Sequence, residues 1–414
     1  MTTVCHAWGM AAFSPFPGLR YDGATAPASE VIAPPYDVVD SKEREELAAR
    51  SPYNSIHVEL PVPDDEHRLD RYQHADALLS AWQSSGVLLL DDTPAFYVYR
   101  MHFRDEHGTE RVTTGVIGAL GLDPDHTGQV LPHERTMPKP KGDRLELLRA
   151  TGTNLSPIWG LSLSPGLAAV AGQAVATLPA PVAASDDAGV LHELWAVTET
   201  AVLDQISSIV AASPVVIADG HHRYETACFY QAERRAADDG AARPFDAVMA
   251  LVVELSEDEL SVGAIHRLLA GLPAGFDLSG ALGRWFTVKD GPSDLRALGE
   301  AMVLEGALGF VTPAGNRLLV PTPAVDESSE ADLDSSRLDV ALADLPAHEL
   351  SYQHGAEHIA AAVRSGEAQA GVLLRPATVA QIADTAHSGR RMPPKTTFFQ
   401  PKPRTGMVFR PVGD

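Results

Sequence analysis

Residues 214–235 read PVVIADGHHRYETACFYQAERR, and this stretch joins a short apolar run to a longer amphipathic segment. The run PVVIA is typical of a buried β-strand, and the segment that begins HHRYETA is typical of an α-helix. Strands and helices alternate on both sides, with ELWAVT and TAVLDQISSIVAA before the stretch and FDAVMALVVEL after it. This alternation predicts an α/β fold in which a mixed sheet carries flanking helices.

The junction between this strand and this helix concentrates polar residues that folding alone does not require. Backbone N–H groups near Gly220, His221 and His222 would lie at the amino terminus of the helix, where they lack intrahelical partners and attract anions. Gly220 lets a ligand approach the backbone, and Arg223 adds a charge-assisted fork. A neighbouring histidine can donate a hydrogen bond or move a proton near neutral pH. The junction therefore predicts an anion site, with phosphate as the leading candidate.

Asp219 has two interpretations that the sequence leaves open. At the N-cap position, its carboxylate would accept a hydrogen bond from the backbone two or three residues further on. Beside a bound phosphate, it would instead serve as a general base or as a Mg2+ ligand. A zinc site is not expected, because adjacent helical residues such as His221 and His222 point about 100° apart. His221 and Glu225 share one helix face, but no third ligand follows at a recognisable spacing.

Composition argues against several other classes of protein. The chain has 414 residues, of which 45% are hydrophobic, and a net charge of -23, which predicts two or three domains with their own cores. Such an acidic chain is not expected to grip a nucleic-acid backbone. It has no apolar run of membrane-spanning length, no secretory pattern at its start, and two cysteines that form no disulfide or zinc framework. A cytoplasmic location is expected, and nothing in the pattern indicates an oligomeric state.

Three regions are expected along the chain. Residues 1–165 form an α+β region, residues 190–275 form the core with the DGHHR motif, and residues 276–414 form a C-terminal α/β region with a basic tail. In the first region AFYVYRMHF and ERVTTGVIGAL flank DEHG, which predicts a β-hairpin, and SIHVEL predicts a strand. Asp40 followed by Glu43 predicts the start of a helix.

A charged loop supplies further candidates for the phosphate pocket. The sequence LPHERTMPKPKGDRL groups His133, Glu134, Lys141 and Arg144, with prolines that suit a ligand-binding loop. Glu134 could serve as an acid or a base, and the other three could contact phosphate. The alternative is a solvated loop without a ligand.

Two more pairs of basic residues are candidates for the same pocket. His266 and Arg267 follow the next predicted strand and could approach the DGHHR motif, although they could equally begin a surface helix. Lys395 and Lys402 lie in the segment 389–410, which contains no acidic residue. They could close the site over an anion, or the segment could pair with the acidic body of the protein.

Several motifs together resemble a prokaryotic family known as domain of unknown function 1015. They are FSPFPGLRY, APPYDVV, PHERTMPKPKGDRL, NLSPI, ADGHHRY and MPPKTTFFQPKPRTG, and they cover nearly the whole chain. Members of the family commonly carry Pro-Thr-His-Arg after the central region, where this chain reads AIHR at residues 264–267. Because that family has no settled activity, this resemblance alone implies little about function.

The DGHHR motif by itself also resembles the ParB and sulfiredoxin superfamily, which includes free serine kinases. This resemblance implies a nucleotide-binding core in which the motif contacts phosphates and Asp219 supports phosphoryl transfer to a serine hydroxyl. Sulfiredoxins carry a cysteine where His221 stands here, so reduction of sulfinic acid is not implied. ParB proteins add basic DNA-binding helices, for which this acidic chain shows no clear pattern.

The residues and the resemblance together predict an enzyme that transfers a phosphoryl group between ATP or ADP and a small hydroxylated or phosphorylated metabolite, with serine or phosphoserine as the named candidate. In this hypothesis Gly220, His222 and Arg223 bind phosphates, Asp219 and His221 act in catalysis, and Mg2+ bridges the phosphates. The alternative is a nucleotide-binding sensor or ParB-like regulatory protein without turnover. Neither hypothesis includes nucleic acid or membrane as a partner.

Overall fold

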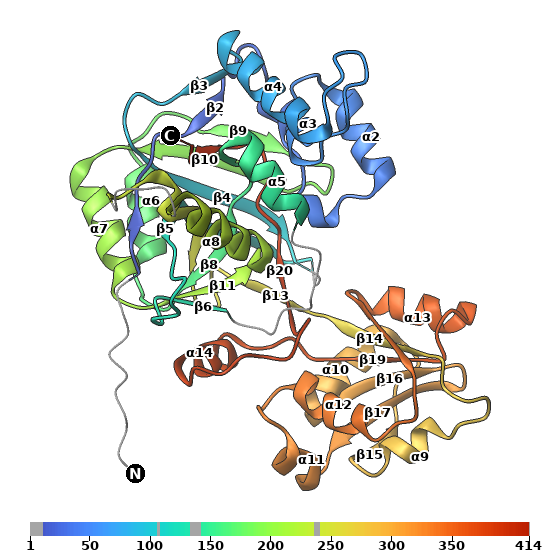
Figure 1. Ribbon diagram of the computed structural model, residues 1–414. Coiled ribbons are helices and arrows are strands. Elements are labelled where there is room, and N and C mark those ends of the chain that lie inside the picture. Colours follow the sequence, from blue (N-terminus) through green and yellow to red (C-terminus); the bar gives the residue numbers. More distant parts are fainter. Residues whose placement is uncertain (1–10, 106–107, 133–141, 236–240, 414) are drawn as a thin grey trace. The chain divides into compact units, whose positions relative to one another are not determined.

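The computed structural model describes residues 11–105, 108–132, 142–235 and 241–413. The chain divides into two compact units (Figure 1). Among the described residues, the first unit comprises residues 11–105, 108–132, 142–235, 241–261 and 401–413, and the second comprises residues 262–400. No helix among the described residues combines the length and the apolar character needed to cross a bilayer.

The first unit is built on a nine-stranded mixed sheet with the strand order β6-β11-β8-β12-β5-β4-β10-β9, in which β1 also pairs with β5. Its strands are β1 (Phe13–Ser14), β4 (Phe96–Arg104), β5 (Glu110–Gly121), β6 (Val130–Pro132), β8 (Ile158–Ser162), β9 (Val182–Ser185), β10 (Leu191–Val197), β11 (Val215–Asp219) and β12 (Ala247–Glu254). β11 runs parallel to β6 and β12 runs parallel to β8, whereas the other pairs are antiparallel. The predicted α/β class with a mixed sheet is confirmed, and so is the hairpin of β4 and β5.

The two faces of this sheet have different coverings because successive strand residues point to opposite sides. Phe96 and Val98 of β4 belong to one core with apolar residues of α6 (Leu167–Val175), α7 (Thr200–Ala211) and α8 (His221–Arg235). Tyr97 and Tyr99 point the other way, and their hydroxyls accept hydrogen bonds from the backbone N–H groups of Gly18 and Arg404. The helix that carries the DGHHR motif is therefore anchored on one face of the sheet.

Small helices and short strand pairs from several parts of the chain complete this unit. They are α1 (Ala28–Val31), η1 (Tyr36–Val38), α2 (Ser41–Arg50), α3 (Ile56–Glu59), α4 (Arg71–Ser84), α5 (Gly142–Thr151), η2 (Pro244–Asp246), β2 (Leu19–Tyr21) with β3 (Leu88–Leu90), and β7 (Thr153–Asn154) with β21 (Arg410–Pro411). The start of α2 is confirmed, because the Asp40 carboxylate accepts the N–H of Glu43 at 2.8 Å.

The strand predicted for SIHVEL is wrong, because this segment forms the short helix α3. The side chain of Asn54 explains the turn: its Oδ1 accepts the N–H of Ile56 at 3.0 Å, which is the local bond of an Asx-turn. Its Nδ2 donates to the carbonyl of Glu30 at 2.7 Å. Asn54 is completely buried, so this short helix is fixed from within.

The last residues of the chain return to the first unit. The backbones of Leu19 and Phe409 exchange two hydrogen bonds of 2.9 Å, and those of Ala33 and Thr405 pair in the same way. The expected division at residues 165–190 is not a boundary between units, because β4 and β5 lie beside β10 and β12 in one sheet.

The second unit is built on a six-stranded antiparallel sheet with the order β15-β17-β16-β19-β14-β18. Its strands are β13 (Ser261–Ala264), β14 (His266–Ala270), β15 (Phe286–Asp290), β16 (Leu308–Thr312), β17 (Gly315–Pro321), β18 (Glu349–Gln353), β19 (Ala370–Leu373) and β20 (Thr397–Gln400), of which β13 and β20 form a separate pair. Its helices are α9 (Leu278–Leu282), α10 (Leu295–Glu305), α11 (Pro323–Ser328), α12 (Asp334–Ala343), α13 (Ala356–Ser365) and α14 (Val379–His387). Apolar residues of α9 and α12 form one core with this sheet, and those of α10 and α13 form another.

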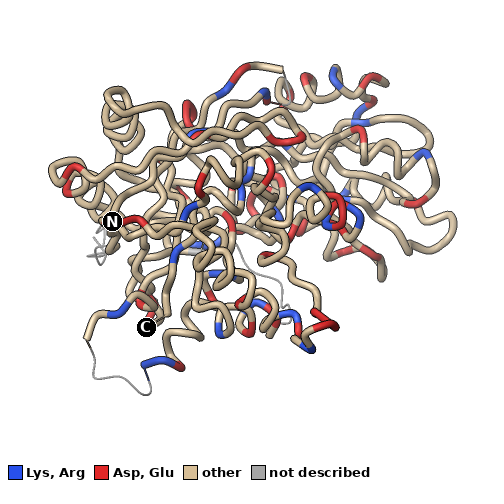
Figure 2. The backbone as a smooth tube through the Cα atoms, turned by 90° about the horizontal axis from the view of Figure 1, so that it is seen from above, with Lys and Arg blue, Asp and Glu red and all other residues tan. Residues whose placement is uncertain are grey.

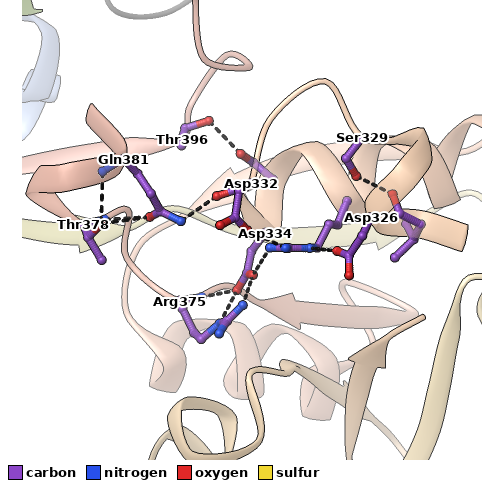
Figure 3. Close-up of polar contacts among 11 residues, drawn as sticks. Asp326, Ser329, Asp332, Asp334, Arg375, Thr378, Gln381 and Thr396 are labelled. Carbon is purple, nitrogen blue, oxygen red and sulfur yellow. Dashed lines mark hydrogen bonds and ion pairs between the residues drawn. The ribbon is translucent and has the colours of Figure 1, made fainter. Parts of the chain in front are cut away.

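Polar contacts around the buried Asp334 connect the start of α12 with the segment after β19, with α14 and with Thr396 (Figure 3). Asp334, at the start of α12, accepts hydrogen bonds from the backbone N–H and the guanidinium of Arg375, which follows β19. Gln381 of α14 donates to the carbonyl of Asp332, and the hydroxyls of Ser335 and Thr396 lie 2.9 Å apart. These contacts are structural, because each charged group in them already has a protein partner.

Candidate functional site

The candidate site is built where β11 ends and α8 begins. Gly220 lies between the two elements with a φ of 88°, in the left-handed region that glycine adopts without strain. A Cβ at this position would lie 3.0 Å from Nε and Nη2 of Arg223. The carbonyl of Gly220 accepts the N–H of Tyr224 at 3.0 Å, which is the first hydrogen bond of the helix. Gly220 is therefore the N-cap, and the interpretation that placed Asp219 there is corrected.

The carboxylate of Asp219 contacts two cations. Its Oδ2 accepts a hydrogen bond from Nη2 of Arg223 at 2.8 Å, and its Oδ1 accepts one from Nζ of Lys402 at 2.6 Å. The same Nζ lies 3.8 Å from Oδ2 of Asp37. The register of β11 against β8 shifts between Ile217 and Asp219, as it does at bulges that re-aim a side chain. The structure thus brings Lys402 from the end of the chain to the DGHHR motif.

The two cations determine the charge state of Asp219. Burial by itself would raise the pKa of this carboxyl, but the positive charges of Lys402 and Arg223 outweigh burial and hold the pKa below its ordinary value. A carboxylate with such a low pKa is a weak proton acceptor, so its surroundings favour orienting a hydroxyl or binding a cation over acting as a general base. His221 and His222 follow as the first two residues of α8, and both are partly buried.

Arg223 extends this cluster to a buried carboxylate that the sequence reasoning missed. Its Nη1 donates to Oγ of Ser156 at 3.2 Å and also to the carbonyl of Pro157. Oγ of Ser156 in turn donates to Oε1 of Glu59 at 3.0 Å. Glu59 is only 2% exposed, and burial raises the pKa of its carboxyl. A continuous hydrogen-bonded series therefore runs from Asp219 through Arg223 and Ser156 to Glu59.

A cavity of about 60 Å3 lies beside this series. The polar side of its lining includes Tyr36, Glu59, Arg144, Ser156, Arg223 and Thr226. Residues 153–155 and the leucine and valine side chains of α5 and β12 complete the wall. Because a single water needs roughly 10–15 Å3 on this measure, the cavity has room for several waters or for part of a small ligand.

Arg144 is the one predicted residue of the charged loop that the structure describes. Its Nη1 donates to the carbonyl of Glu59 at 2.7 Å, and its Nη2 pairs with Asp143 at 2.7 Å. Its guanidinium lies 4.5 Å from the centre of the Tyr36 ring. These contacts place Arg144 in the cavity wall. The other predicted residues of the loop lie outside the described residues, and their roles stay predictions: His133, Glu134 and Lys141.

His266, Arg267 and Lys395 belong to the second unit. Nδ1 of His266 accepts the N–H of Leu374 at 3.1 Å, and burial lowers the pKa of His266 to about 4, so this ring carries no charge at neutral pH. Arg267 is 1% exposed, and its Nη1 donates to the carbonyls of Ile265 and Lys395. The contacts of His266 and Arg267 are structural, and the role predicted for exposed Lys395 stays a prediction.

The distribution of charged residues and of metal-binding side chains limits which ligands the candidate site can bind. Acidic and basic residues are interspersed over much of the described chain (Figure 2). Among the described residues, no three His, Cys, Asp or Glu side chains are grouped to hold a metal ion. Mg2+ in nucleotide sites commonly needs only one or two carboxylates together with phosphate oxygens, and Asp219 can supply such a ligand.

The family model described as protein of unknown function DUF1015 matches residues 13–341. The chain belongs to this family. A search of the curated proteins finds no match.

This DUF1015 chain is also similar to several solved structures, at low identity. A conserved hypothetical protein from Pyrococcus furiosus is 15% identical, with 71% of this chain and 93% of that chain covered and a TM-score of 0.36. Free serine kinase in complex with AMP is 16% identical, with coverages of 69% and 87% and a TM-score of 0.37. SbnI with a C-terminal truncation, from Staphylococcus aureus, is 11% identical, with coverages of 70% and 86% and a TM-score of 0.36. Likeness at this level supports no conclusion about the activity of the DUF1015 chain.

Tyr36, Ser156 and Glu59 of this DUF1015 chain were not among the predicted site residues, and they differ in how strongly the sequence indicates them. Tyr36 and Ser156 lie inside the motifs APPYDVV and NLSPI, which the family resemblance already singled out. Glu59 belongs to none of these motifs, and it is the penultimate residue of SIHVEL, a segment that was predicted only as a strand.

Proposed function

We propose that the DGHHR element, residues 219–223, binds the phosphates of ATP or ADP, and that the protein transfers the terminal phosphoryl group between this nucleotide and the hydroxyl of a small metabolite. The observation that carries the proposal is the cluster of Asp219 with Arg223 and Lys402 at the amino end of α8, a helix of 15 residues. Two cations and a helix terminus converge there on one point.

Phosphoryl transfer depends on positioning and charge neutralisation more than on covalent catalysis, and these are what the cluster offers. The backbone N–H groups of the first turn of α8, which the helix itself cannot pair, can share the negative charge of a phosphate together with Arg223 and Lys402. When the phosphoryl group moves, its bond to the leaving phosphate oxygen breaks and a bond to the acceptor oxygen forms, while the hydroxyl proton is released. Asp219 orients that hydroxyl, and His221 can take a proton near neutral pH.

A bound Mg2+ would neutralise charge on the phosphate oxygens. Asp219 is the carboxylate that would hold it, and this role requires Lys402 to leave Oδ1. The resemblance of DGHHR to free serine kinases makes serine the first acceptor to test. The same residues serve the reverse direction, in which phosphoserine loses its phosphoryl group.

A nucleotide sensor without turnover is the second candidate, and one observation favours it. Each carboxylate oxygen of Asp219 already contacts a cation, Arg223 on one side and Lys402 on the other. A carboxylate engaged in this way holds the two cations that would face a bound phosphate, Arg223 and Lys402, and it need not orient a hydroxyl. In that case the cluster would report nucleotide binding through rearrangement of these two ion pairs.

Two measurements separate these functions. Calorimetric titration with ADP and ATP tests whether the site binds nucleotide, and 31P NMR of the protein with nucleotide, MgCl2 and L-serine tests whether a phosphomonoester forms. We expect both binding and a new phosphomonoester signal. Binding without that signal would replace the enzyme by the sensor, and absence of binding would overturn both.

A further inference from the structure

Glu59 has an arrangement that a purely structural carboxylate does not need. It is the last residue of α3, whose first residue, Ile56, donates its backbone N–H to the Asn54 side chain. The backbone carbonyl of Glu59 accepts a hydrogen bond from Nη1 of Arg144 at 2.7 Å. Its side chain is 2% exposed. The backbone and the position of the side chain are thus held rigidly before any ligand arrives.

The two oxygens of this carboxylate differ. Oε1 accepts the hydroxyl of Ser156, whereas Oε2 is buried without a hydrogen-bond partner among the residues that the structure describes. Buried polar atoms of native proteins are nearly always paired, so this oxygen, on a residue that lines the cavity and without a partner among the described residues, is suited to accept a hydrogen bond from a bound ligand.

The charges around the cavity restrict what that donor can belong to. Arg223 is engaged by Asp219, and Arg144 is engaged by Asp143, so both guanidinium groups are already neutralised. The remaining wall combines polar groups of Thr153, Asn154 and Thr226 with the apolar side chains of Leu147, Leu148, Leu155 and Val248. The wall therefore offers one carboxylate, that of Glu59, beside a partly apolar surface, which suits a short carbon chain that carries a hydroxyl.

We infer that the cavity beside Glu59 is the subsite for a small hydroxylated molecule, and that Glu59 Oε2 accepts a hydrogen bond from its hydroxyl. This inference rests on the proposed function, because the series through Ser156 and Arg223 joins this subsite to Asp219 and the phosphate-binding end of α8. Glu59 then determines specificity: it selects molecules with a hydroxyl over analogues that lack one.

Pairs of probes that differ by one hydroxyl test the inference without any variant. L-serine is compared with L-alanine, L-homoserine with L-2-aminobutyrate, and glycerol with 1,3-propanediol, in calorimetric titrations of the full chain at saturating ADP. At least one hydroxylated probe is expected to bind about tenfold or more tightly than its partner, since a hydrogen bond to a charged group contributes roughly that factor or more. Equal affinity within every pair, or no binding of any probe, would overturn the inference.

The variant Glu59→Gln keeps the shape of the side chain and replaces Oε2 or Oε1 by a donor. It is expected to abolish the preference within the pair while ADP affinity stays within about twofold, because the phosphate-binding residues are untouched. Glu259→Gln is the matched control: Glu259 is a partly buried carboxylate of the same unit whose Oε2 already accepts the N–H of Thr114 at 2.6 Å. This control should leave the preference intact.

Thermal unfolding of the unliganded variants adds a readout that separates the two roles of Glu59. A ligand-binding carboxylate with an unpaired oxygen should leave the melting temperature of Glu59→Gln unchanged or raised. A lowered melting temperature together with an unchanged hydroxyl preference would show a structural role and overturn the inference. If ADP binds neither protein while the hydroxyl preference persists, the proposed function fails and the subsite stands.

Discussion

Replacing Arg223 by methionine should destabilise the first unit, even though this residue belongs to the proposed ligand site. The guanidinium makes hydrogen bonds to Asp219, Ser156 and Pro157, and its side chain is 11% exposed. Removing one partner of a buried ion pair costs about 3–5 kcal/mol. Because Lys402 still neutralises Asp219 at 2.6 Å, we expect the lower end, about 3 kcal/mol for Arg223→Met.

Urea unfolding followed by the fluorescence of the tryptophans measures this loss. Arg149→Met is the matched control, because Arg149 pairs with Glu146 and Glu233 on the surface with a side chain 40% exposed. Such exposed, solvent-screened pairs contribute little to stability. The reasoning is refuted if Arg223→Met and Arg149→Met shift the midpoint equally. In addition, ADP affinity of Arg223→Met should fall about tenfold to a hundredfold, the value of one or two hydrogen bonds to a charged group.

Three further predictions follow from other groups. Asp219→Asn should remove turnover while ADP affinity is kept or increased in calorimetry, because the neutral amide no longer competes with phosphate for the two cations; normal turnover would contradict this. Burial lowers the pKa of His266 in the folded protein to about 4, from an ordinary value of 6.5. The folded state therefore favours the neutral ring, and this contribution to stability is fully present above pH 6.5. About 3 kcal/mol of it is lost as the pH falls towards 4. His266→Gln, which can still accept the backbone N–H, should flatten that part of the stability–pH curve in urea unfolding at pH 7 and pH 4, and an unchanged slope would refute it. Burial raises the pKa of Cys228 to about 11, so iodoacetamide should modify it slowly at pH 7.5, and Cys228→Ala should keep full turnover; rapid labelling in mass spectrometry would oppose this.

Local signals predicted the elements around the site well. The apolar run before Asp219 forms β11, the amphipathic segment after Gly220 forms α8, and the alternating runs around DEHG form the hairpin β4–β5. These elements depend on periodicity and turn residues within a few positions of each other. The same signals failed at SIHVEL, because Asn54 bonds the backbone of Ile56 and turns the chain into a helix.

The composition of the site was less predictable because its members come from distant parts of the chain. Lys402 was a candidate, but nothing in its neighbourhood indicated that its partner would be Asp219 rather than a ligand. Glu59 is linked to Arg223 through Ser156. Glu59 and Ser156 are 97 positions apart in the sequence, and Ser156 and Arg223 are 67 positions apart. Such pairings are set by the order of strands in the sheet, and one sequence read alone does not display that order.

The return of residues 401–414 to the first unit affects how the protein is made. The ribosome synthesises the chain from its N-terminus, so all of residues 262–400 are translated before this segment exists. Until then the first unit lacks β21, the backbone pairing of Phe409 with Leu19, and Lys402 beside Asp219. A nascent chain that has completed only its large sheet therefore holds Asp219 with Arg223 as its partner but without Lys402. The amino end of α8 gains its second cation only late in translation, after the second unit has had time to fold.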